Sequence, residues 1–247
     1  SDPSNPVEGQ VWYNSTDNLV KGASVTTAGS WATGGSLNTA RTQVSGAGTS
    51  NTSALAFGGE GPPTTGATES YNGSAWTEVN DLNSAKQLAA GTGTQTSALS
   101  IGGIVGGSKT ANTESWNGSS WTEVSNLNTA RHMLAGAGTS TSALAFGGRI
   151  PGVTGETESW NGTSWTELNN LNTVREKPGG AGIQTSALAF GGATPANTAV
   201  TELWSGSSWA EQNDLSTARQ GSGGAGTTSN ALAIGGFVAS VTGATEE

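Results

Sequence analysis

Glutamates recur along this 247-residue chain at intervals of 44 or 45 residues, in the positions Glu69, Glu114, Glu158, Glu202, Glu246 and Glu78, Glu123, Glu167, Glu211. Paired carboxylates are the machinery of glycoside hydrolysis. A catalytic pair should break a repeat's symmetry, whereas a residue present in every unit usually has one structural role. With one Arg or Lys per unit, these glutamates are expected to form ion pairs between neighbouring units or hydrogen bonds to loop backbone. We expect no enzyme.

Other catalytic and metal-binding chemistries lack their residues. The chain has no Cys and one His, so a histidine triad or a multi-histidine metal site cannot form within it. His132 takes a slot that Thr42, Gln87, Glu176 and Gln220 hold in the other units, and we expect it to be a solvated loop-end residue. Neither the D-x-D-x-D pattern of calcium loops nor a G-x-x-x-x-G-K phosphate cradle occurs. No cofactor and no metal are predicted.

Charge and composition narrow the class of partner. The net charge is −9 with only nine Lys and Arg, which disfavours nucleic acid and anionic membrane surfaces. There is no apolar run long enough to span a membrane, and Ser1 to Pro6 show no signal-peptide pattern. The chain is rich in Gly, with 39 residues, but its nine regularly spaced Trp argue against disorder.

An internal repeat organises the chain. Trp31, Trp76, Trp121, Trp165 and Trp209 are separated by 45, 45, 44 and 44 residues. A leucine, a basic residue and a Gly-Gly pair recur at the same spacing. The leucines are Leu37, Leu82, Leu127, Leu171 and Leu215, and the basic residues are Arg41, Lys86, Arg131, Arg175 and Arg219. The Gly pairs begin at Gly58, Gly102, Gly147, Gly191 and Gly235. Five ordered copies indicate five structural units.

Each unit predicts four short strands. In the second unit they are residues 88–94, 97–101, 113–116 and 121–124, and Asn117-Gly118 between the last two favours a tight hairpin turn. Four strands in about 45 residues is the size of one propeller blade. The predicted fold is therefore all-β: a five-bladed β-propeller of four-stranded antiparallel blades over residues 23–247.

The repeat resembles the kelch repeat, in which a Gly pair is followed by an aromatic residue and then a Trp. Gly103, Trp116 and Trp121 fit this order, although the family's usual Tyr is more often Trp here. The resemblance covers about residues 25–247. It implies a propeller whose blades pack through these aromatics, and it implies little about activity.

The two ends of the chain carry the pieces of one blade. Thr245-Glu246-Glu247 stops before a fourth strand, and Gly29-Ser30-Trp31-Ala32 looks like that strand. We expect the N-terminal strand to complete the last blade and close the ring, which removes free sheet edges; truncation of a longer array is the alternative. Residues 1–22 form an extension outside the repeat, with a possible hairpin of residues 10–14 and 19–21. Its stretch from Pro6 to Asn14 resembles segments of phage tail-fibre proteins.

Two regions of each unit differ from copy to copy, whereas the other turns are nearly identical in all copies. The two variable regions are the loop after the Gly pair and the three positions after the basic residue. Because successive loops of a propeller alternate between its two faces, both variable regions are expected on the same face. Variable loops on a fixed scaffold are typical binding sites, although relaxed constraint explains them too. Ile104 and other apolar residues there are expected to be exposed. The predicted ligand-binding residues are Gln43, Gln87, Lys109, His132, Met133, Arg149, Ile150, Glu176, Lys177, Gln220 and Phe237.

These features favour a non-catalytic recognition module, the receptor- or glycan-binding part of a phage tail fibre or virion appendage. Its expected partners are a cell-surface glycan or protein, or neighbouring virion proteins, with no nucleic acid and no membrane insertion. Its expected location is the virion or the extracellular space. A purely structural virion module and a carbohydrate-active enzyme are the alternatives.

Overall fold

A computed structural model describes residues 11–14, 19–22 and 33–247. The chain divides into two compact units, residues 1–34 and 35–247. In the first unit, β1 (Val11–Asn14) and β2 (Leu19–Gly22) pair antiparallel, with Trp12 opposite Lys21. The predicted domain boundary after residue 22 stays a prediction.

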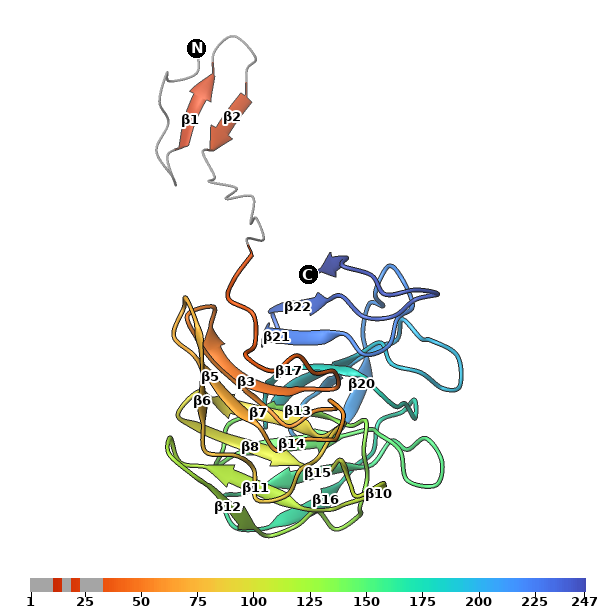
Figure 1. Ribbon diagram of the computed structural model, residues 1–247. Helices are drawn as coiled ribbons and strands as arrows, with labels where there is room; N and C mark the ends of the chain where they lie inside the picture. The colour runs from red at the N-terminus through yellow and green to blue at the C-terminus, as the bar shows by residue number, and fades with distance from the viewer. Residues whose placement is uncertain (1–10, 15–18, 23–32) are drawn as a thin grey trace. The chain divides into compact units, whose positions relative to one another are not determined.

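The second unit is a five-bladed β-propeller, as predicted, and its blades are small antiparallel sheets (Figure 1). Strands follow one another from the centre outward in chain order. Blade 1 holds β3 (Ser45–Ser50), β4 (Ser53–Phe57), β5 (Thr68–Tyr71) and β6 (Trp76–Val79); blade 2 holds β7 (Ala90–Thr94), β8 (Ser97–Ile101), β11 (Thr113–Trp116) and β12 (Trp121–Val124), with a small loop hairpin of β9 (Ile104–Val105) and β10 (Ser108–Lys109).

The remaining blades repeat this order. Blade 3 holds β13 (Ala135–Gly138), β14 (Ala143–Phe146), β15 (Thr157–Trp160) and β16 (Trp165–Leu168); blade 4 holds β17 (Gly179–Ile183), β18 (Ser186–Phe190), β19 (Thr201–Trp204) and β20 (Trp209–Glu211); blade 5 holds β21 (Gly223–Thr227), β22 (Asn230–Ile234) and β23 (Thr245–Glu246). Blade 5 therefore has three strands among the described residues. The predicted fourth strand, Gly29 to Ala32, lies outside them.

The first strand of blade 2 begins later than predicted. Leu88 has a φ of 56°, in the left-handed region, which a β-strand does not contain. The strand therefore starts at Ala90 and not at Leu88. The other three strands of this blade have the predicted bounds.

Neighbouring inner strands lie side by side in the order β3, β7, β13, β17 and β21. Their small residues permit this close approach. A Cβ atom added at Gly180 would lie 3.1 Å from the Gly136 carbonyl oxygen of the preceding blade and 2.9 Å from a ring carbon of Phe146. The Gly-rich inner strands are thus a packing requirement, because close-packed interiors leave no space for added atoms.

Tryptophans from the fourth strands join the blades. The ring of Trp121 in blade 2 lies 4.8 Å from the ring of Phe57 in blade 1, and its Nε1 donates to Thr68 Oγ1 at 3.0 Å. Trp209 in blade 4 repeats this arrangement on blade 3, with Phe146 at 5.1 Å and Thr157 Oγ1 at 3.0 Å. Both indoles are buried. Each such indole therefore fills a site in the preceding blade and satisfies its only donor there.

The repeated basic residue and glutamate form an ion pair within each blade, and not between blades as predicted; the pair is buried in blades 1 to 4, whereas Glu246 in blade 5 is 20% exposed. The pairs are Arg41–Glu69 at 2.5 Å, Lys86–Glu114 at 3.2 Å, Arg131–Glu158, Arg175–Glu202 at 2.5 Å and Arg219–Glu246. The predicted bonds to loop backbone are present: Glu114 Oε2 accepts the Asn83 N–H at 2.7 Å. Asn83 belongs to the connection from blade 1 to blade 2. The ion pair thus anchors the incoming connection to its own blade.

Candidate functional site

The two variable regions of each blade adjoin in the structure. His132 N donates to the Arg149 carbonyl oxygen at 3.2 Å, and Arg149 N returns a bond of 2.8 Å to the His132 oxygen. Equivalent bridges join Thr42 to Glu60, Gln87 to Ile104, Glu176 to Ala193 and Gln220 to Phe237. The ten regions form one surface, which we call the variable face: residues 42–44, 60–65, 87–89, 104–109, 132–134, 149–153, 176–178, 193–197, 220–222 and 237–241.

A chain of strained residues runs through the variable face from blade to blade. Gln43, Leu88, Met133 and Lys177 have φ values of 51–58°, which are uncommon for residues with side chains. Met133 N donates to the Leu88 oxygen at 2.9 Å, and Lys177 N donates to the Met133 oxygen at 2.7 Å. Gly221 N donates in turn to the Lys177 oxygen at 2.9 Å. These interblade bonds hold the strained backbone in place, and such strain is concentrated at functional sites in proteins generally.

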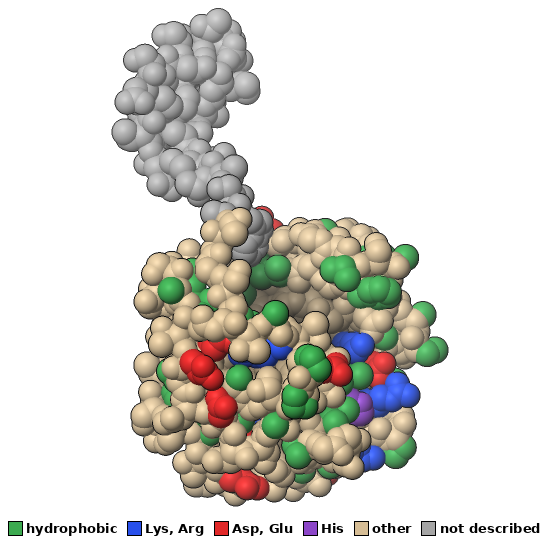
Figure 2. All heavy atoms as spheres, viewed as in Figure 1, with side chains coloured by type: hydrophobic (Ala, Val, Ile, Leu, Met, Phe, Trp, Pro, Cys, Tyr) green, Lys and Arg blue, Asp and Glu red, His purple; other side chains and the backbone are tan. Residues whose placement is uncertain are grey.

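Charged side chains of three blades meet on this face. Arg149 Nη1 of blade 3 lies 2.8 Å from Glu176 Oε2 of blade 4, and the Arg149 side chain is 44% exposed. His132 is half-buried and not fully solvated as predicted, and its buried Nδ1 has no hydrogen-bond partner among the residues that the structure describes. Burial lowers the pKa of His132; Glu176 opposes this shift, whereas Arg149 and Lys109 add to it. In Figure 2 the histidine lies at the right of the view, beside basic and acidic side chains.

The remaining predicted site residues differ in exposure. Phe237 is 44% exposed, as expected, but Ile104 and Ile150 are half-buried, because these first loop residues are drawn into the backbone pairing. Gln43 is exposed and its Nε2 donates to Glu60 Oε2 at 2.6 Å. Lys109 is exposed as well. The half-buried members of the set are Gln87, Met133, Glu176, Lys177 and Gln220.

Sequence reasoning missed two features of the face. Asn197 Nδ2 of blade 4 donates to the Phe237 and Val238 oxygens of blade 5, both at 2.8 Å. Asn197 has no counterpart in the repeat pattern, so the sequence carried no signal for this contact. A groove of about 500 Å³ lies between the loops of blades 1 and 2, lined by residues including Pro63, Thr64 and Ile104. The variable face thus offers a concave apolar part beside its charged cluster.

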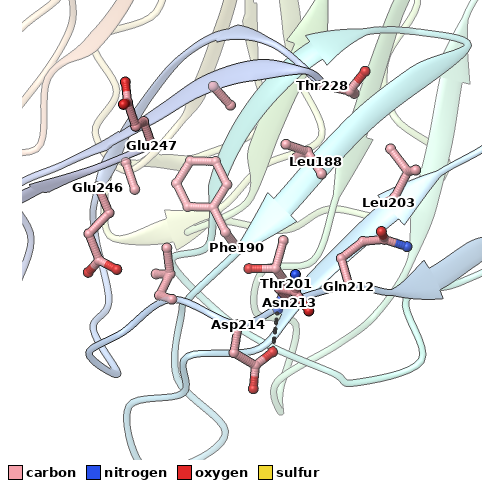
Figure 3. Close-up of a pocket in the computed structure, with 13 residues that line it drawn as sticks. Leu188, Phe190, Thr201, Leu203, Gln212, Asn213, Asp214, Thr228, Glu246 and Glu247 are labelled. Atoms are coloured by element: carbon pink, nitrogen blue, oxygen red, sulfur yellow. Dashed lines mark hydrogen bonds between the residues drawn. The ribbon is translucent and has the colours of Figure 1, made fainter. Parts of the chain in front are cut away.

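A second cavity lies away from the variable face, between the outer parts of blades 4 and 5 (Figure 3). Its volume is about 320 Å³, and none of the predicted ligand-binding residues lines it. Its walls include Phe190, Thr201, Leu203, Asn213 and Leu215. The cavity therefore lies between two packed blades and apart from the predicted ligand-binding residues.

Across the described residues, no group of three or more His, Asp and Glu side chains is arranged to hold a metal ion. Within residues 33–247 and the β1–β2 hairpin strands there is no helix long and apolar enough to cross a membrane.

Comparison with known proteins supports the fold alone. No protein-family model matches the chain, and no curated protein matches it. The chain is similar to the solved structure of YjhT, with 14% sequence identity and a TM-score of 0.70 over 83% of this chain and 80% of that chain. At this identity the likeness extends to the propeller architecture and not to activity, since one fold hosts many functions. The kelch resemblance of the repeat stays a prediction.

Proposed function

We propose that this propeller is a non-catalytic recognition module that binds a cell-surface glycan or protein through the variable face. The observation that carries the proposal is the pairing of both variable regions in all five blades, as in the bridge between His132 and Arg149. Sequence differences between blades are thereby gathered on one surface of a nearly uniform scaffold. A scaffold of this kind that carries variable loops is typical of binding proteins.

The groups on the face suit polar recognition. Gln43, Gln87 and Gln220 carry amides that both donate and accept, which matches the hydroxyls of a glycan. Arg149 and Glu176 add a charged pair, and Phe237 adds an exposed ring. The proposed mechanism is contact through several loops at once, without bond-making chemistry.

We place the module on a phage tail fibre or related virion appendage, in the virion or extracellular space. The support is the resemblance of Pro6 to Asn14 to tail-fibre segments and the low charge of the Gly/Ser/Thr/Ala-rich repeats. Neighbouring virion proteins would then be its other partners.

A glycan array tests the proposal with three proteins. They are the parent, a variant with the five loops 60–65, 104–109, 149–153, 193–197 and 237–241 replaced by Gly-Ser, and a matched control with Gly-Ser in the copied hairpin turns 72–75, 117–120, 161–164 and 205–208. We expect the parent and the turn control to bind and the loop variant to fail. Binding retained by the loop variant would move the site to the repeated elements. If the parent binds neither the glycan array nor a cell-surface protein array, a purely structural module would be favoured.

A further inference from the structure

The basic residues of the propeller are divided between two places. Of the nine Lys and Arg in the chain, Lys21 lies in the other compact unit, and five form the ion pairs with the repeated glutamates. The remaining three, Lys109, Arg149 and Lys177, all lie on the variable face, in the consecutive blades 2, 3 and 4. We call these three residues the cationic sector. Within residues 33–247, every cation that no repeated glutamate holds is therefore on the proposed binding surface.

The variable face also differs in sign of charge from the rest of the propeller. It carries the three cations and two carboxylates, those of Glu60 and Glu176, so its formal net charge is +1. The rest of residues 33–247 carries five cations and thirteen side-chain carboxylates, which gives −8. An anion that approaches residues 33–247 is therefore repelled by most of the surface and favoured at the variable face.

The three cations are grouped around His132. Burial lowers the pKa of this imidazole, and Arg149 and Lys109 lower it further, because both positive charges oppose protonation of the same ring. These two cations come from different blades and thus act at one place. Lys177 belongs to the next blade, and its N–H donates to the oxygen of Met133, the residue after His132, at 2.7 Å.

Most donors of the cationic sector have no partner among the described residues. Arg149 Nη1 lies 2.8 Å from Glu176 Oε2, but the remaining N–H groups of this guanidinium form no bond there. The ammonium groups of Lys109 and Lys177 form no ion pair with any described residue. Lys109 is exposed, as is 44% of the Arg149 side chain. A carboxylate or sulfate would thus meet charged donors without displacing a protein acceptor.

We propose that the cationic sector binds an anionic substituent, a carboxylate or a sulfate, of the glycan that the variable face recognises; this inference rests on the proposed function. Three cations on a strongly acidic chain are too few for a nucleic acid, whose binding depends on many phosphate contacts. They suit a glycan that carries isolated charges among hydroxyls. Gln87 and Gln220 on the same face carry amides, which can both donate to and accept from those hydroxyls.

A glycan array in which each backbone is present in neutral, carboxylated and sulfated forms tests the inference with three full-length proteins. They are the parent, the variant Lys109→Gln/Arg149→Gln/Lys177→Gln, and the control Thr77→Glu/Thr122→Glu/Thr166→Glu. The control changes the net charge of the chain by the same amount, at exposed positions of the outer strands β6, β12 and β16. It therefore separates contact with the cationic sector from the overall charge of the protein.

We expect the parent to bind a carboxylated or sulfated form about tenfold more tightly than the neutral form of the same backbone, which is the effect of one charged hydrogen bond. The glutamine variant should lose this preference and still bind the neutral form, whereas the control should keep the preference. The identity of the preferred form, carboxylated or sulfated, assigns the anion.

Equal affinity of the parent for charged and neutral forms would overturn the inference and leave the proposed function standing. Binding on a cell-surface protein array without any binding to glycans would do the same, whereas binding on neither array would overturn both. Single-stranded DNA bound as tightly as the charged glycan would reveal a general polyanion site and contradict the inference. Loss of the preference in the control would show that overall charge, and not the cationic sector, selects the ligand.

Glu176→Gln tests the contact at Arg149 directly. The amide oxygen of Gln can still accept from Arg149 Nη1, so the guanidinium keeps a partner while a carboxylate that repels the ligand is removed. We expect the affinity for the charged glycan to rise about threefold, with no change for the neutral form. Glu60→Gln is the matched control, because Glu60 is an exposed carboxylate of the same face in blade 1, and it should change neither affinity. An unchanged or lower affinity of Glu176→Gln for the charged glycan would place the anion away from Arg149 and overturn the assignment.

Discussion

Removal of one glutamate should reveal how strongly the buried ion pairs hold the propeller. Glu202 on β19 is fully buried, and its carboxylate contacts the equally buried Arg175 at 2.5 Å. It also accepts the backbone N–H groups of Asn172 at 2.7 Å and Thr173 at 3.1 Å. Glu202→Ala therefore leaves a buried guanidinium without its counter-ion and two backbone donors without acceptors.

The expected loss follows from this contact set. Breaking a buried ion pair by removing one partner costs about 3–5 kcal/mol, because the remaining charge stays desolvated. Arg175 retains the carbonyl oxygens of Gly191 at 3.1 Å and Val200, which places the expected loss near the lower end, at about 3 kcal/mol. Total folding free energies are only about 5–15 kcal/mol, so the effect is large.

Equilibrium urea unfolding followed by tryptophan fluorescence measures the loss. Glu211→Ala is the matched control, because Glu211 is directly opposite Glu202 on β20 but exposed. We expect the control to change the free energy of unfolding by less than about 0.5 kcal/mol, as surface substitutions usually do. In the double variant Arg175→Met/Glu202→Ala, the loss should be smaller than the sum of the two single losses by at least about 1 kcal/mol.

Equal losses for Glu202→Ala and Glu211→Ala would refute the reasoning, because the two differ mainly in burial and in the contact with Arg175. Additive losses in the double variant would show that the two side chains do not stabilise each other. That second result would mean that the repeated glutamate serves only to bind the loop backbone.

Three further predictions concern other repeated positions. Burial opposes the charge of Glu69, but hydrogen bonds from the Asn38 N–H and the Arg41 guanidinium hold the pKa of Glu69 below its usual 4.5. The unfolded chain therefore binds more protons than the folded chain, so this stabilisation is present above about pH 4.5 and is lost as the pH falls through the lower folded pKa. Glu69→Gln should flatten this loss of stability in acid unfolding curves. Lys86→Arg should raise the free energy of unfolding in urea by about 0.5–1 kcal/mol, because a guanidinium adds donors for buried carbonyl oxygens that the Lys ammonium does not reach. An unchanged or lower free energy of unfolding would contradict this prediction. Gly180→Ala should lower the stability of the fold by about 1–3 kcal/mol, because the added methyl group clashes with the neighbouring inner strand. Gly152 has open space around it, so Gly152→Ala should leave the stability unchanged when both variants are measured by thermal unfolding.

The repeat spacing predicts the fold well, because each turn, strand and strand end of a blade requires a particular residue type that recurs in the sequence. Asn117-Gly118 marks the turn, Trp121 marks the fourth strand, and the Gly pair of residues 102 and 103 ends the second strand. Each marker reflects a local requirement: positive φ, an interblade site, or close packing of backbone. Requirements that recur five times are visible even without related sequences.

Pairing across the blade is less visible in the sequence. Spacing shows that Arg131 and Glu158 recur together, but it does not show which blade a side chain faces, so the ion pairs were predicted between blades and lie within them. Burial at the variable face was missed for a similar reason. Ile104 and His132 are half-buried because the loop start pairs with the strand start through backbone bonds, which carry no signal in residue type.

The same backbone bonds explain how the variable face tolerates its variation. The bridge between Gln87 and Ile104, and that between His132 and Arg149, use only main-chain N–H and C=O groups, as do the interblade bonds from Leu88 through Met133 to Lys177. Main-chain bonds form with almost any side chain, so residue types can change there without loss of the frame. The ion pairs between the basic residue and the glutamate, in contrast, require charged side chains, and one is present in every blade. The propeller thus separates residues that hold its shape from residues free to vary, which is the division that the proposed recognition surface requires.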